Sequence, residues 1–357
     1  MRGFVLALML MGVGLQAADL PEGAREIVEH FMREKQVPGV AAAVYYQGQS
    51  YLVNFGLAGP SKHVSPDTIF EIASITKVFT STALSLEVLN GRMQLNAPIT
   101  EYLPRLNHNQ ALKGVTLRAL ASHSASMPRI PPGGGYTHES LMRYFSKRWR
   151  PEWPVGSKYL YSNVGFGLLG YALAAREEVP YFQVLERLIL QPLGMNSTWI
   201  VVPQGMRGNY AQGIGRNGNF AEEYRLNAWP AGGALRSTSR DMLKFLLANL
   251  GVEGPEGLLK AMQFAQEGIF NVNDKLTIGL AWQRFQEGGL LIIDKNGGVD
   301  GFSSYIGMIP EKKIGVVLLA NRGFTQITET GRRVLRELNR QGIEAGANTP
   351  ALSSSPG

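Results

Sequence analysis

Residues 70–77 of the chain read FEIASITK and place Ser74 and Lys77 three positions apart at the start of a predicted helix. The helix is predicted over 75–89, where apolar residues recur at helical spacing and Asn90-Gly91 follows as a stop signal. Positions i and i+3 share a helix face, so the Lys77 amine can reach the Ser74 hydroxyl. A lysine that faces a buried cleft has a lowered pKa and can act as a base, which predicts an activated serine nucleophile. A helix-capping serine with a surface lysine is the alternative for this stretch alone.

A second group of polar residues, Tyr161-Ser162-Asn163, lies in the middle of the chain. Tyr161 can pass a proton if neighbouring cations lower its pKa, and the Asn163 amide offers a donor and an acceptor to a substrate amide. Of the 13 tyrosines, only Tyr161 is followed by an asparagine two positions later. A loop tyrosine with an asparagine in a turn is the alternative.

A third group, Lys295-Asn296-Gly297, follows an apolar stretch and precedes Gly298. We expect a strand over 290–295 that ends here, and a turn at 296–298. A lysine at a strand end can hold a carboxylate, and glycines let a substrate backbone approach the strand. A hairpin turn with an exposed lysine is the alternative.

Strand signals lie near both ends of the chain, while helix signals and Pro/Gly-rich loops fill the middle, roughly 92–230. Further helices are predicted over 22–36 and 327–338. The strands are predicted over 40–46, 50–55, 290–295, 302–309 and 314–320. The expected fold is α/β (α+β): an antiparallel sheet built from both chain ends and flanked by helices, with a mostly helical lobe inserted and a cleft beside it.

We expect a single catalytic domain over 18–343. Its sheet lobe would cover about 22–73 and 235–343, and its helical lobe about 74–234. Residues 344–357, rich in Ala, Ser, Pro and Gly, are expected to be disordered.

Residues 1–17 are typical of a secretory signal peptide, with basic Met1-Arg2, a short apolar stretch and a small residue at Ala17. A membrane anchor is the alternative, but the stretch is short for a bilayer. We therefore expect a periplasmic or secreted bacterial protein, monomeric and without an integral membrane segment once the signal is removed.

The composition excludes several classes of protein. Hydrophobic residues make up 45% of the chain and charged residues 18%, which suits a globular fold with a large core. The absence of cysteine excludes disulfides, thiolate nucleophiles and Cys-ligated metals. The net charge of +7 is spread along the chain, so no nucleic-acid partner is expected.

The five histidines bear on the chemistry only through His123. They are scattered at positions 30, 63, 108, 123 and 138 without metal-ligand spacing, so they predict no metal site. A Ser-His-Asp triad is the rival arrangement, but the chain has no Gly-x-Ser-x-Gly stretch. We expect His123 to order its own loop by hydrogen bonding.

Taken together, SITK at 74–77, YSN at 161–163 and KNG at 295–297 resemble the three motifs of the serine β-lactamase and penicillin-binding protein family. The chain is most similar to class C β-lactamases and related DD-peptidases. Residues 117–128, LRALASHSASMP, resemble the loop after the first helices of that family, and the resemblance covers roughly 22–341.

This resemblance implies a role for each residue of the three motifs. Ser74 is acylated, Lys77 and Tyr161 move its proton to the leaving nitrogen and later activate water, and Asn163 orients the substrate amide. Lys295, Asn296 and Gly297 bind substrate, with Lys295 holding its carboxylate, and the backbone N–H groups of Ser74 and Gly298 form the oxyanion hole. The resemblance implies no metal and no cofactor.

Three positions depart from the class C pattern. Asn296 stands where the family has threonine, no glutamine precedes Trp149-x-Pro151, and 231–234 reads AGGA where class C enzymes have a tyrosine lining the cleft. The glycine pair is more similar to DD-peptidases and family esterases. These differences concern the β-lactamase assignment and leave serine acylation untouched.

The resemblance implies a β-lactamase that hydrolyses the β-lactam amide through an acyl-enzyme, with a small-molecule β-lactam as partner. The alternatives are a D-alanyl-D-alanine carboxypeptidase or endopeptidase acting on peptidoglycan stem peptides, a family esterase, and a penicillin-binding sensor without turnover. Asn163 and Lys295 count against the esterase, and an intact Ser74, Lys77 and Tyr161 counts against the sensor.

Overall fold

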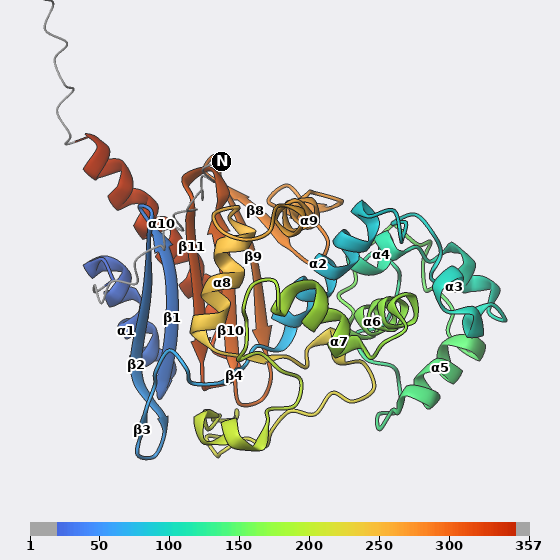
Figure 1. The fold of residues 1–357 in the computed structure, drawn as a ribbon, viewed down its shortest axis with the longest axis horizontal. Coiled ribbons are helices and arrows are strands. Elements are labelled where there is room, and N and C mark those ends of the chain that lie inside the picture. Colours follow the sequence, from blue (N-terminus) through green and yellow to red (C-terminus); the bar gives the residue numbers. More distant parts are fainter. Residues whose placement is uncertain (1–19, 348–357) are drawn as a thin grey trace, which may run out of the picture.

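The computed structural model describes residues 20–347, so the predicted signal peptide and most of the predicted disordered tail lie outside it. Its main feature is a nine-stranded antiparallel sheet in the order β3-β2-β1-β11-β10-β9-β8-β7-β6 (Figure 1). The N-terminal and C-terminal parts of the chain meet where β1 pairs with β11, with Val44 opposite Val316. This arrangement confirms the predicted fold class. The strands are β1 (Gly39–Tyr46), β2 (Gln49–Gly59), β3 (Lys62–His63), β6 (Phe270–Asn273), β7 (Leu276–Ile278), β8 (Gln283–Glu287), β9 (Leu290–Gly298), β10 (Ser303–Ile309) and β11 (Ile314–Ala320), with a separate pair β4 (Phe70–Glu71) and β5 (Arg236–Ser237).

The sheet is covered on both faces, which explains why its central strands are apolar along their whole length. Alternate residues of β1 point to opposite faces. Val40 and Val44 join the core beneath α1 (Glu22–Lys35) and α10 (Ile327–Ala347), whereas Ala41 and Ala43 join the core on the other side. On that second face α8 (Ser239–Asn249) packs against β1 and β11.

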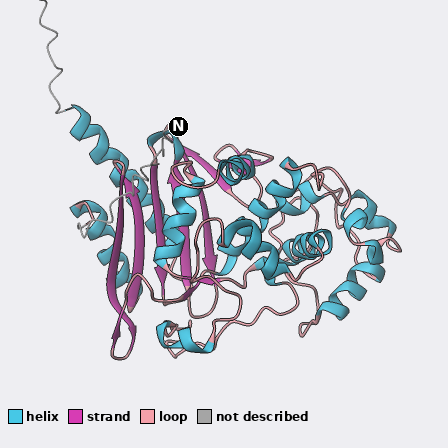
Figure 2. Cartoon of the chain, in the orientation of Figure 1, coloured by secondary structure: helices cyan, strands magenta, loops and turns pink. Residues whose placement is uncertain are grey.

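The remaining helices gather beside the sheet and form the mostly helical part of the molecule (Figure 2). Their bounds are α2 (Thr76–Leu89), α3 (Ile99–Tyr102), α4 (Leu117–Ala121), α5 (His138–Lys147), α6 (Asn163–Glu177), α7 (Tyr181–Leu185) and α9 (Glu256–Gln266). The division into two lobes at 73/74 and 234/235 stays a prediction. Within residues 20–347 no helix has both the length and the apolar character needed to cross a membrane.

Two sequence predictions about elements are corrected here, and three strands were missed. β9 runs through Gly298, so the turn expected at 296–298 is replaced by strand, because Gly297 pairs with Ser304 of β10. Residues 344–347 belong to α10 rather than to a disordered tail. The strands β6 to β8 were not predicted, because they are short and rich in polar residues.

Candidate active site

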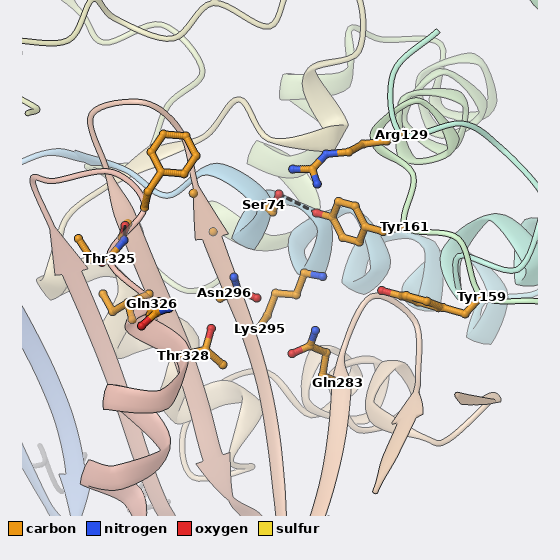
Figure 3. A pocket seen from close by; sticks show the side chains of 15 residues that line it. Ser74, Arg129, Tyr159, Tyr161, Gln283, Lys295, Asn296, Thr325, Gln326 and Thr328 are labelled. Carbon is orange, nitrogen blue, oxygen red and sulfur yellow. Dashed lines mark hydrogen bonds between the residues drawn. The ribbon is translucent and has the colours of Figure 1, made fainter. Parts of the chain in front are cut away.

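The three motifs meet in one cleft of about 360 Å³ at the edge of β9 (Figure 3). Lys77 and Asn163 do not line this cleft but contact each other, and Lys77 also contacts the lining residue Ser74. The lining residues predicted from the sequence are Ser74, Tyr161, Lys295, Asn296, Gly297 and Gly298. Segments far apart in the sequence therefore bring together every residue proposed for the site.

Ser74 lies in a 3-10 turn (Ala73–Ile75) that leads into α2. Ala73 has a φ of +47°, a left-handed conformation that non-glycine residues rarely adopt. Hydrogen bonds hold the turn in this shape: Thr76 Oγ1 donates to Ala73 O over 2.7 Å and accepts from Leu235 N–H over 3.0 Å. The strained backbone of Ala73, held by these two hydrogen bonds, places the Ser74 hydroxyl at the cleft in a defined position.

Lys77 is fully buried and has three hydrogen-bond partners. Its Nζ lies 3.2 Å from Ser74 Oγ and 2.8 Å from Asn163 Oδ1, and it also contacts Gly232 O. Burial, with smaller contributions from Lys295 and Arg129, holds the pKa of Lys77 well below its usual value. A neutral amine fits the same contacts, since it can donate to Asn163 and Gly232 and accept the Ser74 proton. Lys77 is therefore suited to act as a base.

Tyr161 completes the contacts of the nucleophile, since its hydroxyl donates to Ser74 Oγ over 2.7 Å. The Lys77 and Lys295 amines lie 4.8 and 5.0 Å from the centre of its ring. Burial nevertheless raises the pKa of Tyr161, against the hydrogen bond to Ser74. The condition set from the sequence, that cations lower this pKa, is not met, because desolvation of the phenolate outweighs both this hydrogen bond and the attraction of the Arg129 cation. Tyr161 is therefore a neutral hydrogen-bond donor in the free enzyme.

Asn163 is the first residue of α6, and the helix start fixes its orientation. Ser162 caps the helix: its Oγ accepts from Gly165 N–H over 2.9 Å and donates to Pro128 O over 2.8 Å. The Asn163 side chain accepts from Lys77 through Oδ1, so its NH₂ group remains to donate to a ligand.

His123 is fixed in a different way from the prediction. Its ring does not bond within its own loop, because Nδ1 accepts from Ser162 N–H over 3.1 Å. The centre of the ring lies 4.5 Å from that of Tyr161, with the two planes tilted by 36°. Burial holds the pKa of His123 well below its usual value, so the ring is neutral. His123 thus positions the segment that carries Tyr161 and does not contact Ser74 among the hydrogen bonds of the described residues.

On the opposite wall, β9 presents Lys295, Asn296, Gly297 and Gly298. Lys295 is almost wholly buried, and burial lowers the pKa of its amine to about 8, although the Asp294 carboxylate opposes this decrease. Its ammonium form therefore exists mainly below about pH 8, where it can attract an anion.

Gly297 allows β9 to lie directly against the nucleophile turn. A Cβ at this position would collide with Ile72 O and with Ser304 Oγ, and would lie 3.0 Å from Ser74 N. A Cβ on the neighbouring Gly298 would meet nothing within 4 Å. The two glycines therefore make a matched pair for a test of close packing.

We expect Gly297→Ala to reduce the free energy of unfolding by about 1–3 kcal/mol, the usual cost of overpacking. The matched variant Gly298→Ala should change it by less than about 0.5 kcal/mol, as for open sites. Urea unfolding followed by circular dichroism measures both. Equal stability of the two variants would contradict the close approach of β9 to the nucleophile.

Several cleft residues escaped the sequence analysis. Arg129, Tyr159, Gln283 and Gln326 line the cleft, and the Gly232 carbonyl binds Lys77. Arg129 directly follows the stretch 117–128, which resembles the family. A charged residue next to that stretch was the signal that could have indicated a place in the cleft. Among the residues that the structure describes, no group of three or more His, Asp or Glu side chains is placed to hold a metal ion.

The chain matches the family model described as Beta-lactamase over residues 24–340. A beta-lactamase of Yersinia enterocolitica is 31% identical over 330 residues, which cover 82% of this chain and 84% of that protein. A beta-lactamase of Psychrobacter immobilis is 30% identical over 370 residues, covering 90% and 89%.

Solved structures agree with the sequence relatives. A class C beta-lactamase superposes with a TM-score of 0.83 at 26% identity, covering 89% of this chain and 96% of that one. A beta-lactamase/D-alanine carboxypeptidase from Pseudomonas syringae superposes with a TM-score of 0.82 at 27% identity, covering 88% and 98%. This chain therefore belongs to the beta-lactamase family.

Proposed function

We propose that the chain is a serine β-lactamase that opens the β-lactam amide through an acyl-enzyme on Ser74. The observation that carries this proposal is the contact of one cleft-facing hydroxyl with two proton-transfer groups: Ser74 Oγ lies 3.2 Å from Lys77 Nζ and 2.7 Å from Tyr161 OH. The beta-lactamases named above, similar along most of the chain, support the substrate class.

In the proposed acylation, neutral Lys77 accepts the Ser74 proton as Oγ attacks the β-lactam carbonyl carbon. The backbone N–H groups of Ser74 and Gly298 donate to the carbonyl oxygen as it becomes negative. When the C–N bond breaks, Tyr161 gives its proton to the nitrogen and regains one from Lys77. The Ser74 proton thus ends on the leaving nitrogen, and Lys77 is neutral again.

In deacylation a water molecule attacks the ester carbon and gives a proton through Tyr161 to Lys77. The proton returns to Ser74 Oγ as the ester bond breaks. The sum of both halves is the addition of one water across the amide bond. Asn163 orients the substrate's side-chain amide, and Lys295 with Asn296 binds the carboxylate beside the β-lactam nitrogen.

The pH profile should show the contribution of Lys295. For a β-lactam with a carboxylate, kcat/KM should fall as the pH rises through about 8, because the Lys295 ammonium is lost there. For a simple thioester without a carboxylate, this alkaline decrease should be absent. Initial rates between pH 5 and 10 measure both profiles.

The variant Lys295→Met provides the control for this profile. It should lower kcat/KM for the carboxylate substrate by about tenfold or more, as expected for loss of a charged hydrogen bond, and leave kcat/KM for the thioester unchanged. An equal loss on both substrates would show that Lys295 serves the structure instead.

A D-alanyl-D-alanine carboxypeptidase is the second candidate, supported by the structural relative named as both a beta-lactamase and a D-alanine carboxypeptidase. Both activities begin with the same acylation and differ in how quickly water reaches the ester.

We also propose that residues 1–17 direct export to the periplasm, that the enzyme works as a monomer, and that it contributes to antibiotic resistance.

Turnover of nitrocefin by the purified mature protein, with intact-mass spectrometry on the same sample, tests the proposal. We expect many turnovers per enzyme and little standing adduct. A stable one-to-one adduct without turnover would favour the carboxypeptidase or a sensor, and stem peptides would be tried next. If the protein shows no turnover and forms no adduct, the proposal that β-lactams acylate its serine is contradicted.

A further inference from the structure

Arg129 brings a positive charge into the cleft that the proposed reaction does not use. It lines the cleft together with Ser74, and its guanidinium carbon lies 5.6 Å from the centre of the Tyr161 ring. Figure 3 shows the guanidinium directed toward Ser74 and Tyr161, across Tyr161 from Lys295. Within residues 20–347 no hydrogen bond or ion pair involves this guanidinium.

The backbone of Arg129 is fixed by the site itself. Asn163 N–H donates to Arg129 O over 3.1 Å, and the Ser162 hydroxyl donates to the preceding Pro128 O over 2.8 Å. Arg129 therefore lies beside Asn163, the residue proposed to orient the amide of the substrate's acyl side chain. Its side chain is exposed and lines the cleft, so it can reach a ligand without moving the loop.

None of the described residues that line the cleft is Asp or Glu. Asp294, which is next to Lys295 in sequence, is paired with Arg332 at 2.6 Å. Lys77 uses its three hydrogen bonds within the protein, so among the described residues Lys295 and Arg129 are the cations that line the cleft and are open to a ligand.

We propose that Arg129 is a specificity-determining residue, which binds a second carboxylate carried on the acyl side chain of the substrate. The inference rests on the proposed function, which assigns the first carboxylate to Lys295 and the acyl amide to Asn163. A guanidinium presents paired N–H donors in the geometry of a carboxylate, and the opposite charges of the two groups strengthen these hydrogen bonds. The preferred substrates are therefore β-lactams with two negative charges.

Three penicillins that differ at one carbon test this proposal. Benzylpenicillin, ampicillin and carbenicillin carry hydrogen, an ammonium and a carboxylate at the α-carbon of the same phenylacetyl side chain. The readout is kcat/KM or, if the protein acylates without turnover, the second-order rate of adduct formation measured by mass spectrometry. The ratio of this rate constant for carbenicillin to that for benzylpenicillin cancels any effect of the charge on Lys77 that both substrates share.

We expect Arg129→Met to lower this ratio by about tenfold, as for loss of a charge-assisted hydrogen bond, and Arg129→Glu to favour ampicillin over carbenicillin. The wild-type ratio should also decrease as NaCl is raised, because the pair is partly exposed. Arg143→Met, which removes an exposed arginine of α5, controls for net charge and should keep the wild-type ratio.

Each outcome decides one of the two proposals. If Arg129→Met keeps the wild-type ratio while Ser74 is still acylated, Arg129 does not bind the side-chain carboxylate and this inference fails alone. If the wild-type protein is acylated by none of the three penicillins, the proposed function itself fails.

Discussion

Ser74→Ala will abolish covalent labelling by a fluorescent penicillin and lower kcat/KM for nitrocefin by about 10⁴-fold or more, as for loss of the nucleophile in other serine hydrolases. The physical reason is that no other hydroxyl occupies its place. Ser74 Oγ alone lies between the Lys77 amine and the Tyr161 hydroxyl among the hydrogen bonds of residues 20–347. The methyl group of alanine can neither give up a proton nor attack a carbonyl.

The stability of the variant and a matched serine separate this loss from misfolding. Ser74→Ala should unfold at the wild-type urea concentration or slightly above, because it leaves Lys77 with two remaining acceptors, Asn163 Oδ1 and Gly232 O. Ser157→Ala, at an exposed serine whose hydroxyl bonds only to Pro154 O, should label normally. Labelling that persists in Ser74→Ala would refute its assignment as nucleophile, and digestion of the adduct would then locate the true site.

The parts of the site that could be predicted from the sequence are those set by local geometry. Helical spacing alone brings Ser74 and Lys77 together, and the structure places them 3.2 Å apart. The strands at 40–46 and 314–320 were predictable because strands buried on both faces are continuously apolar. In both cases the sequence pattern that permits the prediction lies within a few residues along the chain.

The parts that could not be predicted depend on contacts between distant segments. Lys77 meets a backbone carbonyl 155 residues away, at Gly232, in a stretch that sequence comparison marked only as a departure. Asn296-Gly297-Gly298 has the composition of a turn, yet pairing with β10 keeps it extended. The pKa of Tyr161 depends on how deeply the fold buries its hydroxyl, and burial outweighs the attraction of the Arg129 cation. Such balances are properties of packing, which no local pattern contains.

Arg332→Leu should reduce the free energy of unfolding by about 3–5 kcal/mol, because it leaves a buried carboxylate without its counter-ion. Asp294 is fully buried on β9, and Arg332 of α10 holds it with two hydrogen bonds, of 2.6 and 3.2 Å. Burial already raises the pKa of Asp294, and the arginine opposes that rise. Such a loss is a large fraction of the stability of a typical domain and is measurable by urea unfolding.

Two further variants show whether the unpaired charge is the cause. Arg340→Ala removes an exposed pair with Glu337 on the same helix and should cost less than about 1 kcal/mol. Adding Asp294→Asn to Arg332→Leu removes the buried charge and should recover at least about 1 kcal/mol of the loss, because a neutral amide is cheaper to bury. No recovery in the double variant would mean that Arg332 stabilises the fold by packing over Phe285 rather than by charge.

The same double variant links this ion pair to catalysis. The Asp294 carboxylate supports the protonated form of its neighbour Lys295, whose pKa is otherwise lowered by burial. Loss of that carboxylate should therefore lower the pKa of Lys295 further, and the alkaline decrease in kcat/KM should begin below its wild-type position near pH 8. A shift in this direction would show that the Asp294 carboxylate, which pairs with Arg332 of α10, sets the pH range over which the cleft binds anionic substrates.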